Sequence, residues 1–312
     1  MERAKASKNN KRFTRDSIEP LNYPNIHLLN TFDMNQTALP PRPSRSLKGR
    51  VAIVTGAGAF GEDLGNGRAI ALLLAEDGAK VLCIDRDEAL AKRTAEMILG
   101  ENGEESAAYM RADVTVESEC EAAVQFALSQ FGRVDMLVNN VGIMGAPGTA
   151  ETADVTEWTK GLEVNVTSMM LMAKFSIPAM LRNEAGDGGI KGCIVNLGSV
   201  AGLQGGTPSL MYPTSKGAVV NMTRAMAAHH GKDGIRINCV CPGMVYTPMV
   251  YKAGQGMSEE TREARRNRSL LKTEGNAWDV ASAVRFLSGN EARWITGTML
   301  TVDAGATCAG FV

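Results

Sequence analysis

The sequence predicts an α/β protein in which a mostly parallel, doubly wound sheet is covered by helices on both faces. Two patterns lead to this prediction. From Arg50 onward, short apolar runs alternate with helix-length segments in which apolar residues recur at i, i+3 and i+4. A glycine-rich turn directly follows the first apolar run. With 312 residues, 44% of them hydrophobic, the chain is long enough for one large domain of this kind.

Seven apolar runs are predicted to be buried strands, and the segments between them are predicted to be helical. In chain order the strands are Val51–Thr55, Lys80–Asp85, Ala107–Arg111, 135–139, Gly192–Leu197, 235–239 and Met299–Val302. Helical periodicity is clearest at 68–76, Glu117–Phe131 and Ala277–Ser288. A parallel sheet of this type has right-handed crossovers and binds ligands outside the carboxyl ends of its strands.

The first 47 residues differ in composition from the rest. They carry scattered Lys and Arg, no sustained periodicity and the breaker run Leu-Pro-Pro-Arg-Pro at 39–43. We therefore expect an irregular extension at 1–47 and a single folded domain at 48–312. A basic, serine-rich segment would suggest a mitochondrial presequence, but Glu2, Asp16 and the few serines make that the weaker interpretation.

Charge and cysteine content argue against several classes of protein. The net charge of −1 offers no field to attract nucleic acid, and no apolar run reaches the roughly 18 residues of a membrane span. Six cysteines are scattered without the spacing of a zinc site or a disulfide framework, so we expect no metal and a reducing, cytoplasmic compartment. Cys239 and Cys241 alternate on a predicted strand and are expected to be small buried hydrophobes.

The turn after the first strand contains five glycines between positions 56 and 67. A strand, a tight turn and a helix in this order bring backbone N–H groups and a helix N-terminus close to a phosphate. Two sets of glycines fit a dinucleotide-binding turn. Gly56, Gly58 and Gly61 spell G-x-G-x-x-G, whereas Gly56 with Gly65 and Gly67 spells a turn interrupted by extra residues.

The next strand ends in Asp85, and its spacing favours the second set. In dinucleotide folds such an acid lies about 20 residues beyond the last glycine. Asp85 lies 18 residues beyond Gly67 but 24 beyond Gly61. The first set would also place Gly65 and Gly67 inside a helix, at about 1 kcal/mol each relative to Ala. We therefore expect a helix beginning near Asn66, a candidate N-cap, after an enlarged loop at 59–64.

Two acidic residues, Glu62 and Asp63, interrupt this loop. Because like charges would weaken diphosphate binding, we expect both to point away from it, toward solvent, the adenine side or a neighbouring subunit. The alternative is a solvated bulge without a role in the chemistry. Asp85 would repel a 2′-phosphate and so favours NAD, although Arg86 next to it is able to pair with that phosphate and keeps NADP open.

A second group of residues indicates the chemistry. Tyr212 and Lys216 lie four residues apart, which is one face of a helix. A free tyrosine has a pKa of about 10, and a nearby ammonium favours the phenolate, so we expect Lys216 to lower the pKa of Tyr212. Tyr212 is then able to exchange a proton with an alcohol or carbonyl oxygen. Ser199 follows a predicted strand at its carboxyl end and is placed to hold the reacting oxygen.

Taken together, these motifs resemble the short-chain dehydrogenase/reductase family over about 47–306. The segments that carry the resemblance are Thr55-Gly56 with Gly65-Asn66-Gly67, Asn139-Asn140-Val141-Gly142, Ser199, Tyr212-x-x-x-Lys216 and Pro242-Gly243. It implies a Rossmann-type, NAD(P)-dependent oxidoreductase. The chain departs from the family pattern in a phosphate loop about five residues longer than usual and in Val141, where Ala is commoner.

The resemblance also implies a role for individual residues. Asn165 would hold a water in a proton relay to Lys216, and Lys216 would also bind the nicotinamide ribose. Thr247 would fix the carboxamide of the nicotinamide. Further cofactor contacts are implied for Asp113, Val114, Asn139, Gly142, Tyr212, Pro242, Gly243 and Val245. Members usually pair through the helices that carry Asn165 and Tyr212, so a homodimer or homotetramer is expected.

We predict an enzyme that interconverts a secondary alcohol and the corresponding ketone. The expected substrates are hydrophobic small molecules, cyclic ones among them. Apolar residues of the predicted substrate loops are Met144, Leu203, Leu210, Met211, Met244, Tyr246, Met249 and Tyr251. An imine or enone reductase is an alternative on the same site, and a dinucleotide-sensing regulator without turnover is an alternative of another class. Each of these residues, taken alone, also has a purely structural interpretation. Ser199 would then cap a turn, Asn165 would brace the preceding strand, and Tyr212 would be a packed aromatic side chain.

Overall fold

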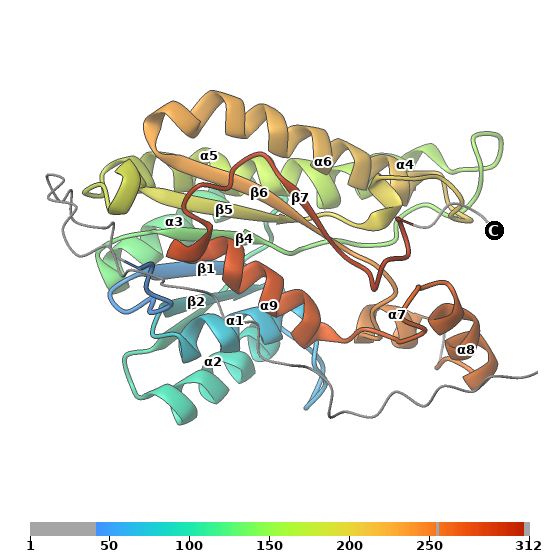
Figure 1. Ribbon diagram of the computed structural model, residues 1–312, viewed down its shortest axis with the longest axis horizontal. Helices are drawn as coiled ribbons and strands as arrows, with labels where there is room; N and C mark the ends of the chain where they lie inside the picture. Colours follow the sequence, from blue (N-terminus) through green and yellow to red (C-terminus); the bar gives the residue numbers. More distant parts are fainter. Residues whose placement is uncertain (1–41, 254–255, 309–312) are drawn as a thin grey trace, which may run out of the picture. The chain divides into compact units, whose positions relative to one another are not determined.

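The structure is a computed structural model that describes residues 42–253 and 256–308. Its folded unit, Pro43–Val312, contains a seven-stranded parallel sheet in the order β3-β2-β1-β4-β5-β6-β7 (Figure 1). The strands are β1 Val51–Thr55, β2 Lys80–Asp85, β3 Ala107–Arg111, β4 Met136–Asn139, β5 Gly192–Leu197, β6 Ile235–Pro242 and β7 Met299–Val302. The predicted doubly wound α/β fold is confirmed, with β4 one residue shorter and β6 three residues longer than expected.

Helices cover both faces of the sheet (Figure 1). One face carries α1 Asn66–Glu76, α2 Glu88–Asn102 and α9 Ala277–Ser288. The other carries α3 Glu117–Phe131, α5 Ser168–Leu181 and α6 Met211–His230. Shorter helices are α4 Val155–Leu162, α7 Pro248–Ala253 and α8 Glu259–Asn267. Single turns of 3₁₀-helix lie at Asp187–Gly189, Val200–Gly202, Gly231–Asp233 and Asn290–Ala292.

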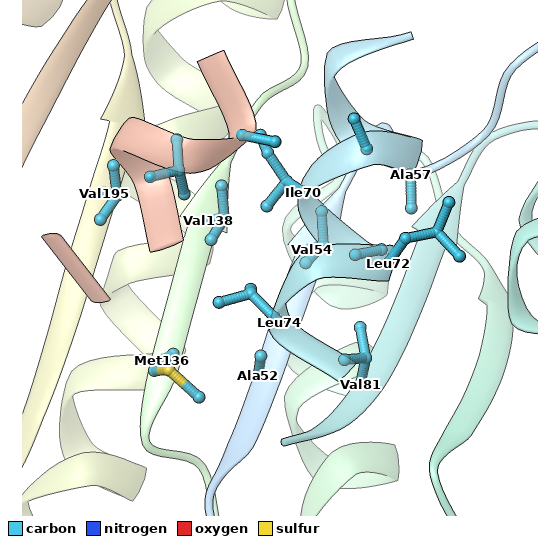
Figure 2. Packing of buried hydrophobic residues seen from close by; sticks show 14 of the residues in the cluster. Ala52, Val54, Ala57, Ile70, Leu72, Leu74, Val81, Met136, Val138 and Val195 are labelled. Carbon is cyan, nitrogen blue, oxygen red and sulfur yellow. The ribbon is translucent and has the colours of Figure 1, made fainter. Parts of the chain in front are cut away.

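The core between α1 and the sheet fixes the helix that begins at the glycine-rich turn. Figure 2 shows Ile70 and Leu74 of α1 directed toward Ala52, Val54 and Val138 of the central strands. All five side chains are shielded completely from solvent. Central strands of a parallel sheet are buried on both faces, which is why they read as continuous apolar runs. This packing holds the N-terminus of α1 at the carboxyl end of β1.

The chain joins the folded unit just before β1. Leu47 is buried in the core, and its N–H donates to the carbonyl oxygen of Asp77 at 2.7 Å. The compact unit therefore begins at Pro43, a few residues before the predicted boundary at 47. The predicted irregular conformation of 1–41 lies outside the described residues.

One helical run, Val155–Leu181, is long and apolar enough to cross a membrane by length and composition alone. It comprises α4, a turn of π-helix at Glu163–Thr167 and α5. Of its most apolar stretch, 56% is buried inside the fold, where Met169 and Met172 are shielded from solvent. A core helix of a soluble protein passes the same test.

Candidate active site

The carboxyl ends of the strands open into a cleft of about 840 Å³. Turns that follow β1 to β6 line it, together with residues of α4, α6, α7 and α8. The predicted site residues that line the cleft are Gly56, Gly65, Gly67, Asp85, Arg86, Asp113, Val114, Gly142, Ser199, Tyr212, Lys216, Pro242, Gly243, Val245 and Thr247. Two predicted residues, Asn139 and Asn165, do not reach the cleft wall.

The glycines of the phosphate loop divide into two groups. Gly56, Gly58, Gly65 and Gly67 line the cleft. A Cβ on Gly67 would lie 2.0 Å from the carbonyl oxygen of Gly56, so only glycine permits the two segments to approach this closely. Gly61 instead faces open space with a φ of +51° and does not line the cleft. Gly61 of the G-x-G-x-x-G set therefore does not reach the cleft, whereas its middle glycine, Gly58, which was not among the predicted cofactor contacts, does.

Helix α1 begins at Asn66 as expected, but the predicted cap is wrong. The N-cap residue is Gly65, in an extended conformation, and no side chain caps the helix. Asn66 is already the first helical residue, so its side chain cannot reach the N–H groups of the following turn. Its Oδ1 is buried without a partner among the described residues, and the first turn contains no acidic residue. The positive end of the helix dipole thus faces the cleft uncompensated.

The two acidic residues of the enlarged loop point away from the cleft, as expected. Glu62 is mostly exposed and forms an ion pair with Arg93 of α2, with 2.5 Å between Oε1 and Nη2. Asp63 accepts a hydrogen bond from Tyr251 of α7. Burial and this bond raise the pKa of the Tyr251 hydroxyl. Both carboxylates therefore tie the loop to its neighbours and leave the cradle free of negative charge.

One part of the cleft is built by the turns after β2 and β3. Asp85 accepts hydrogen bonds from the N–H of Gly58 at 3.0 Å and the N–H of Asp87 at 3.1 Å. A Cβ on Gly58 would lie 2.7 Å from the Asp85 carboxylate, so this contact requires glycine. Asp113 accepts from the hydroxyl and the N–H of Thr115, and these bonds lower the pKa of its carboxyl group.

Ser199, Tyr212 and Lys216 meet at the other end of the cleft. Ser199 follows β5, while Tyr212 and Lys216 lie in the first turns of α6. The Ser199 hydroxyl accepts from the N–H of Ala201 at 3.1 Å and is hydrogen-bonded to the Tyr212 phenol. Lys216 Nζ donates to the carbonyl oxygen of Leu197 at 2.7 Å and lies 5.8 Å from the centre of the Tyr212 ring. Ser199 thus caps a turn and also contacts Tyr212.

Burial dominates the proton affinities at this site. It raises the pKa of Tyr212, and the hydrogen bond from Ser199 only partly opposes the rise. Among the described residues the pKa of Tyr212 is thus raised, and the expected lowering by Lys216 together with a bound nicotinamide stays a prediction. Burial also lowers the pKa of Lys216 to about 8, because its ammonium is almost fully removed from water.

Asn165 lies in the π turn and is completely buried. Its Oδ1 accepts from the N–H of Ile143 at 2.7 Å, and its Nδ2 donates to the Ile143 carbonyl at 2.8 Å and to Ser215 Oγ at 2.9 Å. The side chain thus braces the segment after β4. Gly142 belongs to this segment, and a Cβ on it would lie 3.2 Å from Lys216 Nζ. By holding the segment in place, Asn165 therefore sets the space around the lysine.

Asn139, predicted to line the cofactor, does not line the cleft. Its Nδ2 donates to Asn196 Oδ1 at 2.9 Å inside the sheet. Asn140 lines the cleft instead, and its Nδ2 donates to the carbonyl oxygen of Gly56 at 2.9 Å. Asn139 is the last residue of β4 and its side chain lies inside the sheet, whereas Asn140 follows the strand and reaches the cleft.

The substrate end of the cleft has an apolar wall. Its apolar residues include Ile143, Met144, Met244, Met249, Val250 and Met257. Of the residues predicted for this wall, Met144, Met244 and Met249 line it. Leu203, Leu210, Met211, Tyr246 and Tyr251 do not. Met211, for example, is completely buried against Gly145 and Gly161.

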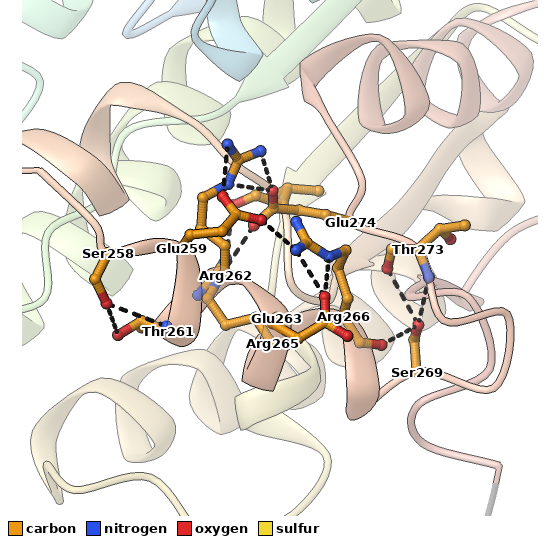
Figure 3. Close-up of polar contacts among 11 residues, drawn as sticks. Ser258, Glu259, Thr261, Arg262, Glu263, Arg265, Arg266, Ser269, Thr273 and Glu274 are labelled. Atoms are coloured by element: carbon orange, nitrogen blue, oxygen red, sulfur yellow. Dashed lines mark hydrogen bonds and ion pairs between the residues drawn. The ribbon is translucent and has the colours of Figure 1, made fainter.

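Helix α8 completes this wall and is held by ion pairs (Figure 3). Glu274, mostly buried, lies 2.6 Å from Arg262 Nη2 and 3.5 Å from Arg265 Nε. Arg265 lines the cleft and also donates to the carbonyl oxygen of Val245 at 3.0 Å. The Arg262 guanidinium stacks on Tyr246, 4.2 Å from its ring centre. The substrate wall is therefore connected to the segment after β6.

Fold and site together define an NAD(P)-binding oxidoreductase of the α/β class, and comparison with known proteins agrees. A family model described as enoyl-(acyl carrier protein) reductase matches residues 61–307. The chain is 39% identical to 2-(S)-hydroxypropyl-CoM dehydrogenase 3 of Xanthobacter autotrophicus, over 85% of this chain and 99% of the relative. It is 34% identical to (+)-borneol dehydrogenase 2 of Salvia officinalis, over 84% and 90%.

A crystal structure assigned to the same family, from Burkholderia xenovorans, superimposes with a TM-score of 0.76 and 36% identity over 85% of this chain and 99% of the other. The chain belongs to the short-chain dehydrogenase/reductase family. It is an NAD(P)-dependent enzyme that interconverts secondary alcohols and ketones.

Proposed function

We propose that the chain uses NAD to interconvert a hydrophobic secondary alcohol and its ketone, with Tyr212 as the general acid and base. The observation that carries this proposal is the convergence of Ser199, Tyr212 and Lys216 beside an apolar wall at the carboxyl edge of the sheet. A hydroxyl, a phenol and an ammonium at one point are the groups required to hold an oxygen and move its proton.

The cradle of the cleft fits a dinucleotide. Three features mark a polar site that glycines keep free of side chains: the backbone N–H groups of the glycine turn, the N-terminus of α1 and the amide oxygen of Asn66, which has no partner within the described part of the chain. Gly56, Gly58, Gly65 and Gly67 would border the diphosphate, Asp85 the adenosine ribose and Thr247 the nicotinamide. A bound nicotinamide supplies the hydride acceptor or donor for the substrate carbon.

The chain's own residues then handle the oxygen and its proton. Ser199 orients the substrate oxygen, and its hydrogen bond to Tyr212 brings the phenol to the same point. Tyr212 gives its proton to the oxygen during reduction and takes it back during oxidation. Lys216, held by Leu197, adds positive charge nearby, and Asn165 keeps the segment before Ile143 in place beside it.

NAD is favoured over NADP because Asp85 lines the cleft where the adenosine ribose would bind. Its carboxylate is oriented by two backbone N–H groups and would repel a 2′-phosphate. Arg86 is exposed and also lines the cleft. Separate titrations with NADH and NADPH, followed by cofactor fluorescence, test the proposal. We expect tighter binding of NADH; tighter binding of NADPH would mean that Arg86 outweighs Asp85.

The apolar wall supports a hydrophobic substrate, including cyclic alcohols. The description of the matching family model also names an enoyl reductase, so reduction of a carbon–carbon double bond is the second candidate. Assays with matched pairs of a saturated ketone and an enone distinguish them. We expect turnover of the carbonyl group; reduction of the enone alone would support the second candidate.

We further propose a homodimer or homotetramer in the cytoplasm. Helices α5 and α6 form one face of the domain, and Met170 and Leu181 of α5 are substantially exposed there. All six cysteines are free thiols, and five of them are buried, which suits a reducing compartment.

A further inference from the structure

The first turn of α1 contains a buried arginine that the proposed chemistry does not use. Arg68 is completely shielded from solvent. Its guanidinium donates to the carbonyl oxygens of Ala59 at 2.6 Å, Gly61 at 2.7 Å and Asp63 at 2.7 Å. Its Nε donates to Thr94 Oγ1 at 3.1 Å. Among the described residues, none of these hydrogen-bond partners is a carboxylate.

A buried guanidinium without a directly bonded counter-ion is costly unless its geometry is satisfied. Here four of its five N–H donors are used, and three of the acceptors are carbonyls of one loop. Arginine's planar fork suits such an arrangement, whereas a lysine ammonium has only three donors for these four acceptors and lacks the fork that spans them. We therefore look for the function of Arg68 in the shape it gives to the enlarged loop at 59–64.

The three carbonyls lie on both limbs of that loop. Ala59 belongs to the limb that leaves the cradle, and Gly61 and Asp63 belong to the limb that returns toward Gly65. Ala59 and Phe60 at the start of the loop line the cleft, whereas the described residues at 61–64 do not. By drawing the carbonyl oxygens inward, Arg68 keeps the negative ends of three peptide dipoles away from a diphosphate and fixes the width of the cradle.

A second contact extends this frame to the cradle itself. Thr94 of α2 accepts from Arg68 and donates its own hydroxyl hydrogen to the carbonyl oxygen of Ala57 at 2.9 Å. Ala57 lies between Gly56 and Gly58, which both border the cleft. Arg68 and Thr94 thus connect the enlarged loop, helix α2 and the glycine turn in one buried network.

We propose that Arg68 is a positioning residue for the cofactor's diphosphate, and that it acts by folding the enlarged loop around its guanidinium. The family's use of NAD(P) is the premise of this inference, and the choice between NAD and NADP does not affect it. The inference explains why an insertion next to the phosphate site is tolerated. The residues at 61–64 are folded onto a cation behind the cradle and do not line the cleft.

Calorimetric titrations of the full chain without substrate test the proposal. The ligands are ADP-ribose, which carries the diphosphate, and adenosine, which lacks it and is measured by competition. The variants are Arg68→Lys, which keeps the charge but not the fork, and Thr94→Val, which cuts the link to Ala57 at nearly constant volume. Arg93→Met is the matched control, because Arg93 contacts the same loop only through an exposed ion pair with Glu62.

We expect Arg68→Lys to weaken ADP-ribose binding by about tenfold, as the loss of charge-assisted hydrogen bonds suggests, with adenosine binding unchanged. Thr94→Val should give a smaller loss with the same selectivity, and Arg93→Met should change neither. Equal losses for both ligands, or wild-type affinity of Arg68→Lys for ADP-ribose, would overturn the proposal. Failure of the wild-type chain to bind either ligand would instead refute dinucleotide use itself. Should Arg68→Lys not fold, the selectivity of Thr94→Val decides alone.

Discussion

The chemistry of single residues in this enzyme depends on burial more than on neighbouring charge. Tyr212 and Lys216 are four residues apart, yet the phenol's pKa is raised and the ammonium's is lowered, both chiefly by removal from water. The described residues therefore hold Tyr212 as a neutral phenol. A positively charged nicotinamide, when bound beside it, is the further charge that would favour the phenolate.

Replacement of Tyr212 by Phe tests its assignment directly. General acid–base catalysis contributes a factor of about 10²–10⁴, so we expect turnover to fall by that amount. NADH affinity should stay within about twofold, because the phenol's hydrogen bond is to Ser199 and not to the phosphate cradle. The measurements are initial rates and an NADH titration of the same preparation. Full activity of the variant would refute the role of Tyr212, and a signalling response without any turnover would support a sensor.

The lowered pKa of Lys216 makes a prediction about stability. Below about pH 8 both the folded and the unfolded chain hold the proton, and folding bears the cost of burying the charge. Between about 8 and the ordinary value of 10.5, the unfolded chain binds a proton that the folded chain does not. The free energy of unfolding therefore rises with pH in this window, by roughly 3 kcal/mol for this group.

Urea unfolding of the wild type and of Lys216→Met at a series of pH values from 7.5 to about 10.5 measures this contribution. Subtracting the free energy of unfolding of the variant from that of the wild type at each pH removes the contribution of the groups that titrate in both chains. We expect the wild type to gain on the variant as the pH rises. Lys232→Met, which removes an exposed lysine, is the control and should run parallel to the wild type. Parallel curves for Lys216→Met as well would show that the buried ammonium is not destabilised.

At the scale of elements, the glycine turn and α1 form one unit. A Cβ on Gly67 would meet the Gly56 carbonyl at 2.0 Å and Asn140 Nδ2 at 2.7 Å, and the first of these is backbone that cannot rotate away. We expect Gly67→Ala to lower the free energy of unfolding by about 1–3 kcal/mol and to weaken NADH binding. Thermal unfolding with and without NADH checks both effects.

Gly100 provides the matched control for this substitution. It lies inside α2, and a Cβ there meets nothing within 4 Å. Gly100→Ala should therefore stabilise the chain by about 0.5–1 kcal/mol through helix propensity and leave NADH affinity unchanged. If Gly67→Ala behaved in the same way, the close approach of the turn to α1 would not be a requirement of the fold.

At the scale of the whole molecule, the sequence predicted most of the fold for a simple reason. Strands buried on both faces must be continuously apolar, so their positions can be recognised without knowledge of their partners. The cleft followed because the strand ends of such a sheet share one edge.

Other features depend on contacts that no local pattern reveals. Asn139 and Asn140 are identical side chains, and only the exact end of β4 decides which one reaches the cleft. In the sequence, Arg68 has the appearance of a cation on the exposed face of a helix. Its burial depends on the loop at 59–64, which has no periodicity and folds onto the guanidinium. The rise in the pKa of Tyr212 likewise depends on the depth of the site.

Subunit assembly can be tested through α5. We expect a solution mass of twice or four times the chain mass of 33.2 kDa. Met170 is 44% exposed on α5, and Met170→Lys should shift the mass toward the monomer if this helix lies in the interface. Leu271→Lys changes a residue that is 70% exposed outside α5 and α6 and should leave the mass unchanged. Light scattering after gel filtration measures both, and a monomeric wild type would contradict the proposal.

The π turn at Glu163–Thr167 makes the length of this segment a requirement of the site. Such a turn holds one residue more than a regular helix and is less favourable than the α-helix on either side of it. Deleting one of its five residues would restore an uninterrupted helix from α4 to α5 and rotate Asn165 out of reach of Ile143. The shortened chain is expected to be less stable and to turn over more slowly, because the buried amide of Asn165 would lose its hydrogen bonds to Ile143. This segment is therefore expected to tolerate substitution at exposed positions but not a change in length.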